Sequence, residues 1–115
     1  MIQWFSKKKN GRLSEYDLSI NKVKDGFSII FRNNIATKIS FTGFFEFGIS
    51  DNKVYFREAS EKNGRKFSPM KNPYHFRATF SSPEEIEILA KFEGDYDFEF
   101  DEKEECFFVD RRKVK

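Results

Sequence analysis

Basic and aromatic side chains alternate over one short stretch of the sequence, and this combination could bind a polyanion. Lys53, Tyr55 and Arg57 are spaced with period two, and further basic residues follow them. Proteins bind single-stranded nucleic acids with cations that contact the phosphates and rings on which the bases stack. The candidate nucleic-acid-binding residues are Lys53, Tyr55, Arg57, Lys62, Arg65, Lys66 and Arg77. A polar sheet face exposed to solvent would give the same pattern, and the chain has no RNP-type sequence.

A second group of candidate residues is acidic and alternates with aromatic side chains over residues 95–101. Its members are Asp95, Asp97, Glu99 and Asp101. Like charges on one strand face repel each other, so these carboxylates should be exposed, lie near Lys or Arg, or bind a basic partner. The alternative hypothesis is therefore a protein-interaction or inhibitor module, of the kind found in phages or mobile elements, that binds a basic protein through this strand and a helix.

The same acidic stretch begins like a calcium-binding loop, Asp-x-Asp-x. That loop needs Gly at its sixth position and Glu at its twelfth, and these positions are Phe100 and Cys106 here. We therefore expect no metal ion and no other cofactor.

Nucleophilic catalysis would have to use Cys106, the single cysteine, and His75, the single histidine. A thiol nucleophile needs a nearby base and an activating environment, and nothing in the sequence links these two residues. Patterns typical of phosphate loops, dinucleotide-binding turns and zinc proteases do not occur. One cysteine also excludes an internal disulfide and a multi-cysteine zinc site. We expect a binding module without enzymatic activity.

Charge is distributed unevenly along the chain, although the formal net charge is only +2. Residues 1–80 carry a net charge of +8, residues 81–105 carry −9, and residues 106–115 carry +3. Three interpretations remain open: a surface on which the two signs compensate, a basic body that attracts nucleic acid, or an acidic region that binds a basic protein. Both functional interpretations require the opposite charges to stay apart after folding.

The N-terminal segment holds two further features. Lys7–Lys9 and Arg12 form a basic cluster around Gly11, which could be a phosphate-contacting arm or a solvated loop. Trp4 and Phe5 form an apolar pair that could pack against a sheet edge or contact a second subunit.

The composition predicts one folded domain over residues 1–115. Leu, Ile, Val and Phe make up 28% of the chain, above the ~20% below which charged chains tend to stay disordered. No apolar run approaches the ~20 residues that a membrane span needs. With no visible secretory signal and a single cysteine, we expect a cytoplasmic protein.

The spacing of the apolar residues predicts mainly strands. The chain has 16 Phe, and aromatic residues favour pleated, half-buried surfaces. Period-two alternation predicts hairpins over residues 16–31, 44–59 and 95–110 and a strand over 75–80, while 61–73 is expected to be mostly loop. Two phenylalanine doublets, 44–45 and 107–108, cannot place both rings on one strand face. They indicate that both faces meet apolar surface, or that one ring is free for a partner.

One amphipathic helix is predicted over residues 83–93. Ser82 is the expected N-cap and Pro83 the first helical residue, apolar residues follow with helical spacing, and Gly94 is placed to end the helix. A single helical turn capped by Asn34 is also expected over 34–39. The predicted fold is α+β: an antiparallel sheet of about six to seven strands built from hairpins, with one helix before a closing C-terminal hairpin.

Overall fold

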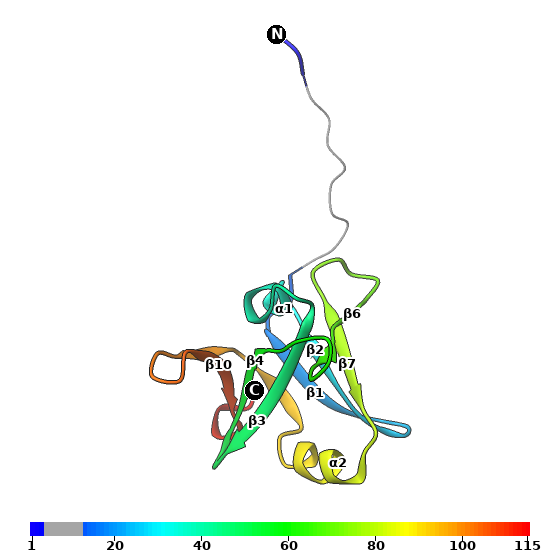
Figure 1. Ribbon diagram of the computed structural model, residues 1–115, viewed down its shortest axis with the longest axis vertical. Helices are drawn as coiled ribbons and strands as arrows, with labels where there is room; N and C mark the ends of the chain where they lie inside the picture. The colour runs from blue at the N-terminus through cyan, green and yellow to red at the C-terminus, as the bar shows by residue number, and fades with distance from the viewer. Residues whose placement is uncertain (4–12) are drawn as a thin grey trace.

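The computed structural model describes residues 1–3 and 13–115 and has an α+β fold (Figure 1). Within these residues the chain forms two antiparallel sheets of five strands each and two α-helices. The α+β class is confirmed, but the prediction of one sheet with six to seven strands is wrong. The basic cluster Lys7–Lys9 and Arg12 and the pair Trp4 and Phe5 lie outside the described residues.

The first sheet, sheet A, contains the predicted N-terminal hairpin. Its strand order is β6-β7-β2-β1-β8. The strands are β1 (Leu18–Val23), β2 (Gly26–Phe31), β6 (Ser68–Pro69), β7 (Phe76–Phe80) and β8 (Gly94–Tyr96). Leu18 on β1 lies opposite Phe31 on β2, and Phe31 lies opposite Phe76 on β7. The hairpin over 16–31 and the strand over 75–80 are therefore confirmed.

The second sheet, sheet B, contains the predicted hairpin over 44–59 and the C-terminal part of the predicted hairpin over 95–110. Its strand order is β5-β3-β4-β10-β9. The strands are β3 (Phe44–Ser50), β4 (Lys53–Glu58), β5 (Arg65–Lys66), β9 (Glu99–Asp101) and β10 (Cys106–Asp110). The hairpin over 44–59 is confirmed, and the segment expected to be a loop over 61–73 supplies the short edge strands β5 and β6.

The predicted continuous strand over 95–101 is wrong, because the chain changes sheet in the middle of it. β8 pairs with β1 in sheet A, whereas β9 pairs with β10 in sheet B. At the change, the Phe98 backbone N–H donates to Asp17 Oδ2 at 3.0 Å. The Phe98 ring packs between the sheets, 5.7 Å from the Phe56 ring centroid. Because the half-buried Phe98 ring packs between the sheets and its backbone N–H is hydrogen-bonded, the alternating segment 95–101 can contribute one strand to each sheet.

Phenylalanine rings join the two sheets face to face. The Phe31 ring of sheet A is fully buried. Its centroid lies 5.1 Å from the ring centroid of Phe45 and 5.4 Å from that of Phe56, both on sheet B, and both ring pairs are edge to face. It also lies 4.9 Å from Phe67, which links β5 to β6. Edge-to-face pairs contribute ~0.5–1.5 kcal/mol beyond the burial of their area. This cluster holds sheet B at a fixed position against sheet A.

The two helices lie at opposite ends of the sheets (Figure 1). Helix α2 (Pro83–Ala90) begins as predicted, because Ser82 Oγ accepts the Glu85 backbone N–H at 3.2 Å, but it ends three residues before the predicted boundary at 93. Helix α1 (Ile35–Ile39) confirms the predicted turn, but not its cap. Asn34 has a φ of 61° and makes no side-chain cap, since an N-cap needs an extended backbone.

Candidate nucleic-acid interface

The face of sheet B that points away from sheet A carries the alternating residues of β4. We call it the outer face of sheet B. Lys53, Tyr55 and Arg57 lie on it, while Val54 and Phe56 point into the core with exposures of 0% and 1%. The cross-strand neighbours on this face are Ser50, Gly48 and Glu46 of β3 and Asp110 and Phe108 of β10. The spacing in the sequence therefore predicted correctly that the three side chains share one face.

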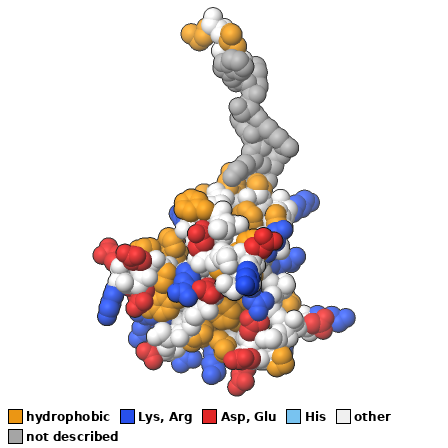
Figure 2. All heavy atoms as spheres, viewed as in Figure 1, with side chains coloured by type: hydrophobic (Ala, Val, Ile, Leu, Met, Phe, Trp, Pro, Cys, Tyr) orange, Lys and Arg blue, Asp and Glu red, His pale blue; other side chains and the backbone are white. Residues whose placement is uncertain are grey.

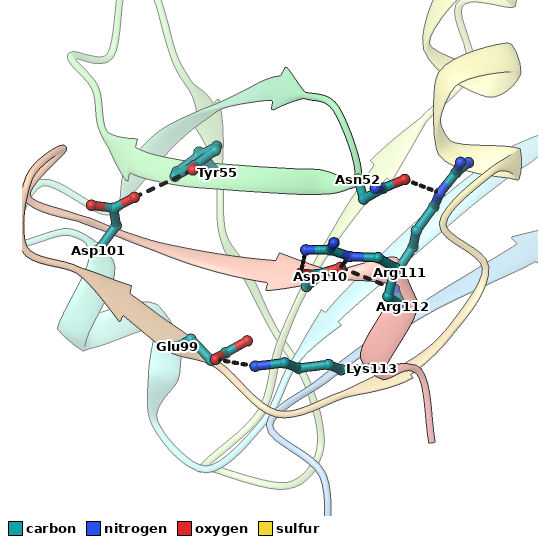
Figure 3. Close-up of polar contacts among 8 residues, drawn as sticks. All are labelled: Asn52, Tyr55, Glu99, Asp101, Asp110, Arg111, Arg112 and Lys113. Carbon is teal, nitrogen blue, oxygen red and sulfur yellow. Dashed lines mark hydrogen bonds and ion pairs between the residues drawn. The ribbon is translucent and has the colours of Figure 1, made fainter.

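An aromatic pair forms the centre of this face. The Tyr55 and Phe108 rings lie 5.5 Å apart, and Lys53 Nζ is 4.8 Å above the Phe108 ring. Phe108 is only 8% exposed, so the half-buried Tyr55 ring is the accessible one. The Tyr55 hydroxyl donates to Asp101 Oδ2 at 3.3 Å (Figure 3). Burial, together with the nearby Asp101 charge, raises the pKa of Tyr55, so the ring stays neutral.

Positive side chains gather at one end of this face, around a polar hollow of about 610 Å³. The described residues that line it are Ser50, Asp51, Asn52, Lys53, Tyr55, Arg111 and Arg112. Arg111 Nε donates to Asn52 Oδ1 at 2.8 Å (Figure 3). The Arg111 backbone N–H also donates to the Asn52 carbonyl oxygen at 2.8 Å. Lys53 forms no ion pair with a described residue. The hollow can therefore accept an anionic group such as a phosphate.

Asp110 fixes the second arginine of this hollow. Arg112 Nε donates to Asp110 Oδ1 at 3.0 Å and its Nη2 to Oδ2 at 2.7 Å, a two-point contact (Figure 3). The Arg112 backbone N–H also donates to Oδ1 at 3.0 Å. These hydrogen bonds lower the pKa of the Asp110 carboxyl, which is 3% exposed, to about 2. Asp110 is thus ionised at neutral pH and holds the guanidinium at the rim of the hollow.

A second hollow of about 490 Å³ adjoins the first and shares Ser50 and Tyr55 with it. Arg57 lines it and pairs with Glu46 across the strands. Cys106 also lines it, and burial, followed by the charges of Asp101 and Glu104, raises the pKa of its thiol. The thiol is protonated at neutral pH and is a weak nucleophile there. His75 precedes β7 of sheet A, whereas Cys106 begins β10 of sheet B.

The remaining basic candidates lie on other strands or in a turn. Lys66 lies opposite Phe44 on the edge strand β5. Arg65 pairs with Glu85 of α2 and stacks 4.5 Å from the Phe80 ring. Lys62 lies in the turn before β5, and Arg77 belongs to β7 in sheet A. Because Phe44 alternates with the buried Phe45, Lys66 opposite it is on the outer face of sheet B, so the structure brings Lys53, Tyr55, Arg57 and, at the β5 edge, Lys66 of the candidate set to one face.

Sequence reasoning missed Phe108, Arg111 and Arg112 as site residues. They reach the outer face because β10 pairs with β4, with Asp110 opposite Lys53. In the sequence, Arg111 and Arg112 contributed only to the charge of the C-terminal segment. The run of basic residues directly after the predicted hairpin over 95–110 was the available signal, but the strand that pairs with the end of this hairpin could not be inferred.

The acidic candidates are engaged within the chain. The partners are Ser19 Oγ for Asp95 (2.6 Å), Lys115 Nζ for Asp97 (3.0 Å), Lys113 Nζ for Glu99 (2.7 Å) and Tyr55 Oη for Asp101 (3.3 Å). Asp101 Oδ1 also accepts the backbone N–H groups of Lys103 and Glu104. On the face seen in Figure 2, acidic and basic side chains are interspersed. The basic C-terminal residues thus neutralise part of the acidic segment, so the opposite charges do not stay apart as both functional interpretations required, and the candidate basic site is reduced to the local group of Lys53, Arg111 and Arg112.

No protein-family model, no curated protein and no solved structure matches the chain. In the part of the chain that the structure describes, no three His, Cys, Asp or Glu side chains gather so that they could hold a metal ion. No helix formed by residues 1–3 and 13–115 is long and apolar enough to cross a membrane.

Proposed function

We propose that this protein binds single-stranded nucleic acid through the outer face of sheet B. The observation that carries the proposal is the convergence of Lys53, Arg111 and Arg112 on one polar hollow directly beside the accessible Tyr55 ring. This arrangement offers charge for a phosphate and a flat surface for a base at adjacent positions, which is what binding without sequence preference needs.

Each side chain has a defined role in this proposal. Lys53 and the two arginines contact phosphate oxygens, while a base stacks on Tyr55 in the adjoining hollow. Asp101 accepts the Tyr55 hydroxyl and thereby fixes the ring, and Asp110 fixes Arg112. A ring that lies in a sheet face can stack only on a base that is not already paired and stacked, which favours a single strand over a duplex.

The acidic strand receives no partner in this proposal. A basic protein would have to compete with Lys113 and Lys115 for Glu99 and Asp97, which are already paired. In the polar hollow Arg112 is likewise paired with Asp110, but Lys53 and Arg111 have no ion pair among the described residues, so two of its three cations need not give up a carboxylate.

Fluorescence anisotropy with labelled single-stranded DNA and RNA tests the proposal. Neutralising three phosphates of a single strand gives a slope of log affinity against log salt of about −2, so affinity should fall about 20-fold between about 50 and 200 mM salt. Lys53→Glu should weaken binding and reduce the slope by about 1. Arg77→Glu is the matched control, because it changes the net charge equally but lies on sheet A.

Two results would contradict the proposal. One is the absence of binding to either strand type at low salt. The other is equal weakening by Lys53→Glu and Arg77→Glu, which would mean that only the net charge of the protein matters and not the outer face of sheet B.

A further inference from the structure

One position of sheet B has no side chain directly opposite the accessible Tyr55 ring. Gly48 of β3 pairs with Tyr55 of β4, and a Cβ at Gly48 would meet no atom within 4 Å beyond its chain neighbours. The second hollow, of about 490 Å³, is lined by both residues, and we call it the Gly48 hollow. Its volume falls in the range of ~300–1,000 Å³ that small-molecule sites occupy, so it has room for one nucleobase.

Glu104 supplies an uncommitted carboxylate to the Gly48 hollow. It lines this hollow and forms no ion pair with another residue that the structure describes. Its charge adds to the effects of burial and of Asp101 in raising the pKa of both Tyr55 and Cys106, so the carboxylate lies near the Tyr55 hydroxyl and the thiol. Asp101 Oδ1 accepts the Glu104 backbone N–H at 3.0 Å and thereby holds the turn that carries this carboxylate.

The two hollows on this face differ in the sign of their charge. Of the described residues, three cations and one carboxylate line the polar hollow, whereas one cation and two carboxylates line the Gly48 hollow. The one cation, Arg57, is paired with Glu46, so Glu104 is the carboxylate that remains uncompensated. A phosphate is therefore attracted to the polar hollow and repelled from Glu104. Because both hollows include Tyr55, a nucleotide with its phosphate in the polar hollow places its base at the Gly48 hollow.

The chemistry of a carboxylate limits which base edge can face Glu104. An ionised carboxylate only accepts hydrogen bonds, so the base must donate one. Cytosine, adenine and guanine each carry an exocyclic amino group that donates, whereas uracil and thymine carry carbonyl oxygens that accept. The ring N–H of uracil lies between two carbonyl oxygens, which the carboxylate would also meet and repel. The Gly48 hollow thus favours a base with an amino group.

We propose that the Gly48 hollow selects the base that stacks on Tyr55, and that Glu104 accepts a hydrogen bond from the exocyclic amino group of that base. This inference rests on the proposed function and deepens it. The phosphate contacts still bind a strand of any sequence, because they do not involve the base. A strand with cytosine, adenine or guanine at this position binds more tightly than a strand with uracil or thymine there.

Fluorescence anisotropy with oligocytidylate and oligouridylate of about ten nucleotides tests the inference. The two strands have the same phosphates, sugar and ring size, and they differ at the edge of the base. Oligocytidylate should bind at least about 5-fold more tightly, the lower end of the discrimination expected from a base-edge contact. Because a base-edge contact releases no counterions, this ratio should stay constant as salt lowers both affinities.

Two carboxylates of the same turn provide a matched pair of variants. Glu104→Gln should bring the affinity ratio of the two strands close to 1, since the amide can donate to uracil as well as accept from cytosine. Glu105→Gln is the control, because Glu105 lies next in the turn and lines neither hollow. It removes the same charge, so it should raise both affinities slightly and leave their ratio unchanged.

Filling the hollow gives an independent test. Gly48→Val places a side chain beside the Tyr55 ring, where the base would lie. It should weaken binding of both strands and remove the preference for cytosine. Because the position has open space and valine favours strands, the melting temperature should not fall. A variant that keeps both its melting temperature and the full preference would show that the base does not enter the Gly48 hollow.

The outcomes separate this inference from the proposed function. If the wild type binds both strands with equal affinity, or binds oligouridylate more tightly, the inference is wrong and the proposed function stands. If the preference for cytosine persists undiminished in Glu104→Gln, Glu104 does not contact the base and the inference is also wrong. If the wild type binds neither strand at low salt, the proposed function fails and the inference with it.

Discussion

Asp110→Asn should destabilise the protein in a way that depends on pH. The pKa of the Asp110 carboxyl is about 2 in the folded chain, against ~3.9 in an unfolded one, and each unit is worth ~1.4 kcal/mol. The ionised Asp110 carboxylate can thus contribute at most about 2.5 kcal/mol to the free energy of unfolding. Because the Arg112 side chain is 64% exposed, water screens the ion pair, and we expect Asp110→Asn to lower the free energy of unfolding by about 1–2 kcal/mol at neutral pH. Since the folded pKa is the lower one, this stability is fully present above about pH 4 and is lost as the pH falls towards 2.

Urea unfolding of the wild type and Asp110→Asn at about pH 7 and pH 3 measures this effect. At about pH 3 the Asp110 carboxyl is mostly protonated in the unfolded chain but still ionised in the folded one. About half of the neutral-pH difference in the free energy of unfolding between the wild type and Asp110→Asn should therefore remain. Asp25→Asn, at the exposed turn between β1 and β2, is the control and should change the free energy of unfolding by less than about 0.5 kcal/mol. Equal destabilisation by Asp110→Asn at both pH values would refute the electrostatic explanation, and no destabilisation at neutral pH would refute the ion pair as a stabilising contact.

Three further predictions concern other positions. Gly94 has a φ of 139°, and a Cβ at this position would collide with Val114 Cγ2. Gly94→Ala should therefore lower the free energy of unfolding by about 1–3 kcal/mol in urea titrations. The control is Gly48→Ala, which has open space around it and should lower the free energy of unfolding by less than about 1 kcal/mol. Tyr96→Phe removes a buried 2.6 Å hydrogen bond from its hydroxyl to a backbone carbonyl and should cost about 1–2 kcal/mol by the same measurement. Cys106, whose thiol pKa is raised, should react with iodoacetamide at neutral pH more slowly than a cysteine in an unstructured peptide, as followed by mass spectrometry.

Local patterns predicted the elements of the fold well. The hairpins β1–β2 and β3–β4 lie where period two and turn residues indicated, because a strand with one buried face must alternate apolar and polar side chains. Ser82 and Pro83 marked the start of α2 for an equally local reason, since a cap acts on the next three residues. The alternation of acidic and aromatic residues over 95–101 wrongly predicted one continuous strand, because an extended segment keeps its period of two when it passes from one sheet to the other.

The candidate site was predicted in part. That Lys53, Tyr55 and Arg57 share one face followed from their spacing alone. The sequence could not show that Arg65 and Arg77 lie away from this face, because tertiary packing determines their neighbours. Arg65 pairs with Glu85 and stacks on the Phe80 ring, and Arg77 belongs to β7 in sheet A. Uneven charge along the chain did not predict separate charged faces, since the C-terminal lysines fold back onto the acidic segment.

By itself, then, the amino-acid sequence determined two of the hairpins, the start of the main helix and the turns between them, and which side chains are apolar enough to be buried. Only the tertiary structure decided which strands are neighbours, and hence that Arg111 lies beside Asn52, 59 positions away, at the end of the Tyr55 face. The physical reason is that periodicity and capping act over a few residues. Strand pairing is chosen by the packing of the whole phenylalanine core, to which every segment contributes at once.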